Sequence, residues 1–135
     1  MNTTRYFLKK IETIDAANLK TMLINDHVII DQSCLFTQLN IQDLISLEQT
    51  DKIEDKVKLY TVKCSTVLLE EFSKAKPQCF LMTSVAGEQF LLGTEHRPFP
   101  SYSITDNYPQ NASGKAGSIL SISYLSTIPL LKVVL

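Results

Sequence analysis

The stretch Gln78–Pro109, QCFLMTSVAGEQFLLGTEHRPFPSYSITDNYP, decides how this chain folds. It contains two apolar runs, Cys79–Val85 and Gln89–Gly93, on either side of Gly87. Because glycine readily adopts the positive φ of a tight turn, this pattern predicts a β-hairpin. Residues 96–109 follow as an arm that is too rich in proline for the interior of a sheet. We expect the rest of the chain to pair with this hairpin.

Alternation of apolar and polar residues predicts further strands before and after the hairpin. The clearest is Ser118–Ser126, where leucine, isoleucine and tyrosine alternate with serine. A second hairpin is expected around the charged segment Asp51–Lys56, which belongs in water at its tip. The strands expected before the central hairpin are Arg5–Ile11, His27–Asp31, Cys34–Ile41, Asp43–Thr50 and Val57–Thr66.

Two segments have helical spacing. Asp15 is well placed as the N-cap of a short amphipathic helix that ends near Asn25. Val67–Lys76 favours one or two helical turns, which Pro77 would end. The predicted fold is therefore α+β and mainly β. We expect an antiparallel, sandwich- or barrel-like sheet of about six to eight strands, with two short helices and an extended proline-rich arm.

The chain has 135 residues, the size of one domain, and no change in composition divides it. Within the single domain 1–135, residues 95–117 are expected to form the extended arm and residues 128–135 an apolar C-terminal tail. Lysine and arginine number 13 against 14 aspartates and glutamates, which gives a net charge of −1. Nucleic acid is not an expected partner, because binding to a phosphate backbone depends on a basic face.

The sequence contains no motif for catalysis, cofactor binding or metal binding. Cys34, Cys64 and Cys79 lack the paired spacing of a zinc site and are expected to be buried, reduced thiols. The four glycines form no phosphate-binding loop, and no G-x-S-x-G sequence marks a nucleophile. We therefore expect no catalytic residues, no cofactor and no metal. We also expect no signal peptide, no membrane span and a reducing, cytoplasm-like compartment.

The arm and the tail are the candidate interface. Arginine and tyrosine are enriched in protein interfaces, and an apolar terminus needs to be covered. A long loop packed on its own domain explains the arm equally well, and a small-molecule site is a further alternative. The candidate interface residues are Arg97, Phe99, Tyr102, Tyr108, Leu130 and Leu131.

Three stretches carry a resemblance to a known group of proteins: QFLLGTEHRPFP (89–100), SITDNYP (103–109) and ISYLSTIPLL (122–131). Together they resemble the C-terminal half of small β-rich proteins encoded in tail or head–tail connector gene blocks of Bacteroidetes phages and prophages. The resemblance covers about a third of the chain and consists of a hairpin, a proline arm and a serine-rich last strand. It implies a virion structural or assembly protein, made in the host bacterial cytoplasm, with copies of itself and other virion proteins as partners.

Our first hypothesis is a non-enzymatic virion assembly protein, a ring-forming connector or tail component that acts through protein–protein contacts. Rings form when head-to-tail contacts close on themselves. On this hypothesis the arm and the tail reach neighbouring subunits. The second hypothesis is a small cytoplasmic β module that binds an apolar ligand or a single protein partner. An enzyme is the third, and it would require a cluster of titratable residues that the sequence does not reveal.

Overall fold

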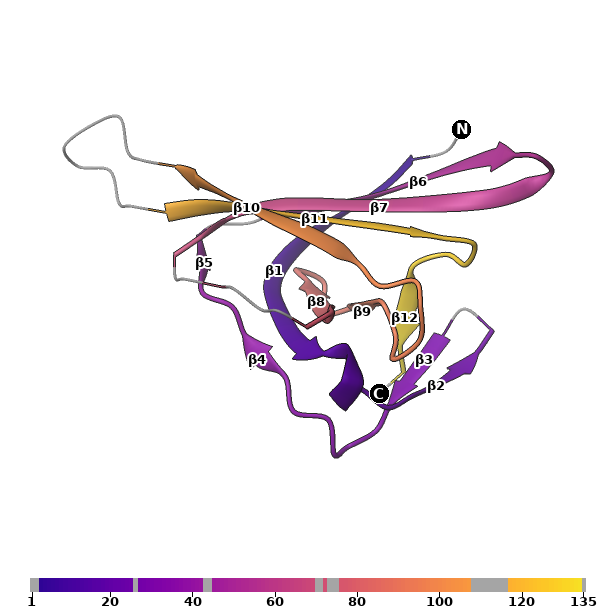
Figure 1. Cartoon of the computed structure of the whole chain (residues 1–135), viewed down its shortest axis with the longest axis horizontal. Coiled ribbons are helices and arrows are strands. Elements are labelled where there is room, and N and C mark those ends of the chain that lie inside the picture. Colours follow the sequence, from indigo (N-terminus) through magenta and orange to yellow (C-terminus); the bar gives the residue numbers. More distant parts are fainter. Residues whose placement is uncertain are drawn as a thin grey trace.

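The computed structural model describes residues 3–25, 27–42, 45–69, 72, 76–107 and 117–134. Within them the chain forms twelve β-strands and one short 3-10 turn, η1. Figure 1 shows their arrangement in space. The elements are β1 (Thr3–Asp15), η1 (Ala16–Asn18), β2 (Thr21–Ile24), β3 (His27–Ile30), β4 (Thr37–Gln38), β5 (Ile41–Gln42), β6 (Ile45–Glu54), β7 (Val57–Leu68), β8 (Gln78–Ser84), β9 (Gln89–Leu92), β10 (Ser101–Asn107), β11 (Gly117–Ser126) and β12 (Leu131–Val133).

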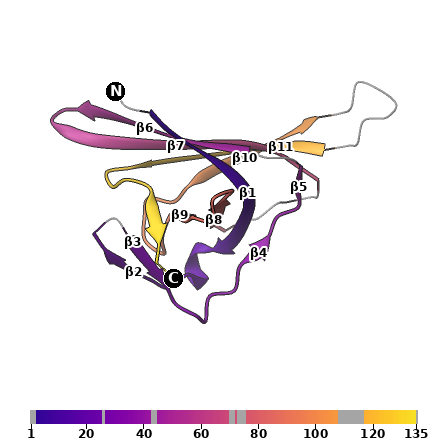
Figure 2. The same ribbon diagram turned by 180° about the vertical axis from the view of Figure 1, so that it is seen from behind.

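The strands belong to one mixed sheet that bends over on itself. Its order is β10-β11-β7-β6-β1-β8-β9-β12-β3-β2, with β4 paired to β1 and β5 to β7. The first half of β1 pairs with β6 and its second half with β8, with an irregularity between Leu8 and Lys10. An irregularity of this kind increases strand twist and allows a sheet to bend. Figures 1 and 2 show β10, β11, β7 and β6 as an upper layer, with β8, β9, β12, β3 and β2 beneath it.

The predicted central hairpin is confirmed as β8 and β9. Gly87 has a φ of 93° in the turn between them. All seven residues of β8 are buried, so both faces of this strand are covered. On one face, Phe80 and Met82 belong to a first hydrophobic cluster beneath the upper layer. On the other face, Cys79 and Leu81 belong to a second cluster with residues of η1, β3 and β12.

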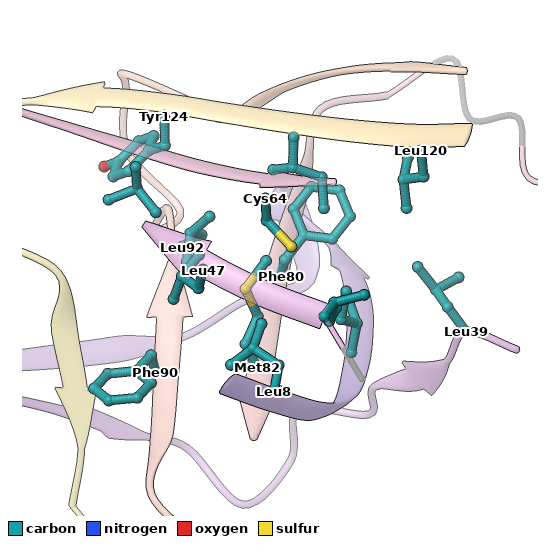
Figure 3. Close-up of a cluster of buried hydrophobic side chains, with 14 of the residues drawn as sticks. Leu8, Leu39, Leu47, Cys64, Phe80, Met82, Phe90, Leu92, Leu120 and Tyr124 are labelled. Atoms are coloured by element: carbon teal, nitrogen blue, oxygen red, sulfur yellow. The ribbon is translucent and has the colours of Figure 1, made fainter. Parts of the chain in front are cut away.

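The first cluster fills the space between the upper layer and the central hairpin. Figure 3 shows Leu120, Cys64 and Tyr124 extending from the upper strands toward the layer that carries Phe80 and Met82. Apolar and polar residues alternate along the upper strands, and every second side chain, the apolar one, points into the core. The opposite side chains of the same strands form the outer face of the molecule.

The second predicted hairpin is also present, as β6 and β7. Its strands are longer than expected, since Glu54 pairs with Val57 and the chain reverses at Asp55 and Lys56. Both turn residues have positive φ, 50° and 66°, as a two-residue hairpin turn requires. The charged segment 51–56 is therefore mostly strand rather than loop.

The expected α+β class with two short helices is wrong, because the described chain is almost entirely β. After η1, the segment expected to be helical forms β2, and Asn25 adopts a φ of 58° where the chain reverses into β3. The second expected helix begins inside β7, which extends to Leu68. Most of its remainder, residues 70, 71 and 73–75, lies outside the described residues. The strand number exceeds six to eight. The strands form one mixed sheet that bends into two layers, so the expected antiparallel, sandwich- or barrel-like form is matched only in part.

The arm and the tail are both integrated into the sheet. Ser101–Asn107 of the arm forms β10, which pairs with β11 at one end of the sheet. In the tail, β12 lies between β9 and β3 and is antiparallel to the first and parallel to the second. The Leu130 N–H donates to the Gln49 side-chain oxygen at 2.6 Å just before β12 begins. Residues 108–116 of the predicted arm lie outside the described residues.

Candidate functional site

A shallow groove of about 640 Å³ lies on the outer face of the upper layer. We call it the serine groove. Four strands build it, and most of the polar side chains that point outward from them are serines. Its polar lining residues are Ser46, Glu48, Lys63, Ser65, Ser101, Ser103, Ser121 and Ser123.

Strand register arranges these side chains in rows across the sheet. Ser101 pairs with Ser123, which pairs with Lys63, which in turn pairs with Glu48. Neighbours in such a row lie about 5 Å apart, so they can contact one ligand together. The row ends at Arg5, whose guanidinium binds the Glu48 carboxylate with an Nε–Oε1 distance of 3.1 Å. The groove therefore offers hydroxyl groups and one lysine to a polar ligand.

The described residues contain no group of histidine, cysteine and carboxylate side chains that could hold a metal ion. The cysteines occupy the positions of core residues. Burial raises the pKa of the Cys64 thiol to about 12, and burial together with the charge of Glu95 raises the pKa of Cys79 to about 12. Both thiols are therefore protonated and unreactive at neutral pH. Cys34 is half-buried, and its sulfur accepts the Lys20 N–H at 3.2 Å.

A second candidate surface is the outer edge of β2, the last strand of the described sheet. In both Figure 1 and Figure 2 it lies at the periphery, with β3 on its inner side and no labelled strand beyond it. Met22, Leu23 and Ile24 are 63%, 48% and 50% exposed. Edge strands are usually protected by charges, proline or a bulge, and Thr21–Ile24 has neither a charged residue nor a proline.

The backbone hydrogen bonds of β2 show which groups face this outer edge. The Asp31 N–H donates to the Lys20 carbonyl at 3.0 Å, so residue 20 is bonded toward β3. Bonding alternates along an antiparallel pair, so Met22 and Ile24 are also bonded toward β3, while Thr21 and Leu23 face outward. In agreement, the Thr21 N–H donates to a Glu95 carboxylate oxygen at 2.8 Å.

Glu95 thus covers the first outward N–H of the edge. Its partial burial acts to raise the pKa of the carboxyl group, but hydrogen bonds from the Thr21 side chain and backbone outweigh this, and the pKa lies below its ordinary value. The carboxylate is therefore ionised at neutral pH and remains a hydrogen-bond acceptor. The outward N–H and C=O of Leu23 have no such partner among the described residues.

The candidate interface residues of the arm and tail lie mostly inside the fold. Phe99 packs against the second cluster, and the Tyr102 ring lies 5.2 Å from that of Phe72. Leu130 packs against the first cluster, and Leu131 is 2% exposed. Only Arg97 is well exposed, and Tyr108 lies outside the described residues. The described parts of the arm and tail therefore pack within this domain, and truncating the tail would remove β12 from the sheet.

Sequence reasoning missed the β2 edge because it assigned this segment to a helix. The signal that could have revealed it is TMLI-ND-HVII, two short apolar runs around Asn25-Asp26. Asparagine and aspartate tolerate the positive φ of a two-residue hairpin turn. The serine groove was also missed, although its signal is the alternating serine in SYSIT and SILSISYLS.

Comparison with known protein families, with curated proteins and with solved structures finds no significant match for this chain. No helix among the described residues is long and apolar enough to cross a membrane.

Proposed function

We propose that this chain is a non-enzymatic assembly protein that acts through protein–protein contacts, with the outer edge of β2 as a contact surface. The observation that carries the proposal is the exposure of Met22, Leu23 and Ile24 on a strand whose outer backbone groups lack a strand partner among the described residues. A strand of this kind is a template for pairing with another chain.

Further exposed apolar side chains support the proposal. Ile29 is the register partner of Met22 and is 39% exposed, and Val134, next to β12, is 45% exposed. Clusters of exposed apolar residues on a folded domain mark sites of interaction. By contrast, β10 at the other end of the sheet exposes Ser101, Ser103 and Thr105. The two ends of the sheet thus differ in chemistry, and the β2 end suits an apolar partner.

In its most specific form the proposal is a ring-forming connector or tail component of a phage particle, located in the virion and assembled with copies of itself and other virion proteins. This form rests on the resemblance of residues 89–100, 103–109 and 122–131 alone. A ring requires a head-to-tail contact between two different surfaces. The two ends of the sheet, β2 and β10, are such a pair.

The test of the general proposal is the mass of the purified protein in solution, measured by light scattering over a wide range of concentrations. We expect species above the mass of 15.2 kDa, with a population that increases with concentration. A monomer at every concentration would contradict the proposal. A closed ring would appear as one discrete high mass, and open-ended pairing as a mass that keeps rising.

The serine groove supports a second candidate, a module that binds a small polar ligand. A volume of about 640 Å³ falls within the range of small-molecule sites. Lys63 has no ion-pair partner among the described residues, so it is available to an anionic group. On this alternative, ligand raises the melting temperature of the wild type, Lys63→Ala abolishes that rise, and the protein stays monomeric. If the ligand raises the melting temperature of Lys63→Ala as much as that of the wild type, the serine groove is not the binding site.

A further inference from the structure

We propose that β2 pairs antiparallel with β2 of a second copy of this chain, about a two-fold axis that passes beside Leu23. The inference rests on the proposed function, because it names the partner of the same edge. It also specifies which residues meet, and the backbone geometry of β2 determines them.

The hydrogen-bonding pattern of the edge selects the register. Leu23 presents both its N–H and its C=O outward, whereas the outward N–H of Thr21 already binds Glu95 at 2.8 Å. In an antiparallel pair, two residues exchange both hydrogen bonds only when each faces the other. Leu23 is therefore the one residue of this edge at which both the N–H and the C=O can bond to another strand. Two copies can exchange both hydrogen bonds when Leu23 of one lies opposite Leu23 of the other.

This register also matches the side chains. With Leu23 opposite itself, Met22 of each copy lies opposite Ile24 of the other, and both are at least 50% exposed in the single chain. Cross-strand apolar pairs of this kind are stabilising. Thr21 falls opposite Asn25, so polar residues meet at the ends of the short ladder. The strand is thus complementary to itself in the antiparallel register in which Leu23 lies opposite Leu23.

The charges near the edge are compatible with two copies. No residue of β2 is charged, and the nearest carboxylate, Glu95, lies at Thr21 at one end of the strand. A two-fold axis at Leu23 places the two Glu95 carboxylates at opposite ends of the paired strands. Like charges are therefore not brought together, as they would be in a parallel pairing of the same strand.

The contact is small, and this determines its strength. A contact between two four-residue strands, with the outward N–H of Thr21 already bonded to Glu95, buries less than the roughly 1,200 Å² of a specific stable interface. We therefore expect a dimer that dissociates on dilution rather than an obligate one. Because a two-fold contact closes after two copies, larger assemblies need another surface, such as the β10 edge.

A charge-swap experiment tests the two-fold register. Leu23→Lys and Leu23→Glu each place like charges directly opposite one another, so each variant alone should dimerise at least about tenfold more weakly than the wild type. Mixed in equal amounts, the two variants should form a heterodimer at wild-type strength or tighter. Sedimentation velocity over a concentration series measures all three. Leu35→Lys and Leu35→Glu are matched controls, because Leu35 is 84% exposed and lies outside the strands.

The outcomes separate this inference from the proposed function. If the wild type associates and the Leu23 variants associate equally well, the β2 pairing is wrong and another contact drives assembly. If the wild type associates but the single variants are monomeric and their mixture does not associate, the two-fold register is wrong, which is the result expected when β2 pairs with a different strand of the second copy. If the wild type is a monomer throughout, both the pairing and the assembly function are contradicted. Unfolding curves for each variant establish that the monomers remain folded.

Discussion

Gly93 lies where β9 ends and the chain turns back across the second cluster. Its φ is 88°, in the left-handed region that side chains rarely adopt. A Cβ atom at this position would lie 2.6 Å from Cδ of Pro100 and 3.0 Å from the Cys79 sulfur. Glycine is therefore required here for two reasons, its backbone conformation and the close approach of a rigid ring.

Replacing Gly93 with alanine should lower the free energy of unfolding by about 2–4 kcal/mol, from the strained backbone and the overlap with Pro100. Urea denaturation measures this loss. Gly87→Ala is the matched control, because Gly87 has a φ of 93° but no atom within 4 Å of the position that an alanine methyl group would take. It should cost only about 1–2 kcal/mol for the backbone. Equal losses for the two variants would show that Pro100 does not pack against Gly93.

At the scale of elements, β8 is the strand on which the two clusters depend. Met82 faces the first cluster and Leu81 the second, and they are 0% and 7% exposed. β11 differs, because Ile122 is 2% exposed while Leu125 is 53% exposed on its outer face. In a strand with two buried faces, substitution at any position is expected to destabilise the fold. In a strand at the surface, every second residue can be substituted with little loss of stability.

Met82→Ala and Leu81→Ala should therefore destabilise the protein by a similar amount, about 2–4 kcal/mol each. In β11 the effect of alanine should depend on the face of the strand. Ile122→Ala, on the buried face, should lower the free energy of unfolding by the same amount, whereas Leu125→Ala, on the outer face, should stay within about 0.5 kcal/mol of the wild type. Chemical denaturation of the four variants provides the comparison. A small effect of Leu81→Ala, like that expected for Leu125→Ala, would contradict a second cluster beneath β8.

The elements that sequence reasoning predicted are those with an unambiguous local pattern. Gly87 between two apolar runs is typical only of a hairpin, and the alternating serines of Ser118–Ser126 are typical only of a strand. The segment after Asp15 did not, because Ala16, Leu19 and Met22 also fit helical spacing. In a four-residue strand, the pairing of Thr21–Ile24 with His27–Ile30 outweighs intrinsic preference, and that pairing is not encoded in local spacing.

At the scale of the whole molecule, long-range pairing decided what sequence reasoning could not predict. β1 bends between Leu8 and Lys10 to join two layers, and β12 inserts between β9 and a strand more than a hundred residues earlier. Neither the bend of β1 nor the position of β12 is indicated by a pattern in the nearby sequence. As a result, Leu131, which the sequence offered as a candidate interface residue, lies in the core of this domain. The serine groove likewise depends on register across four strands.

Association of two copies through the outer edge of β2 should be visible at single backbone amides. Hydrogen exchange, followed residue by residue as a function of protein concentration, detects it without any mutation. The amides of Met22 and Ile24 bond toward β3, so their protection should change little with concentration. Protection of the Leu23 amide should instead increase in parallel with the fraction of associated protein. If the Leu23 amide exchanges rapidly even where the mass shows association, the proposed pairing is contradicted.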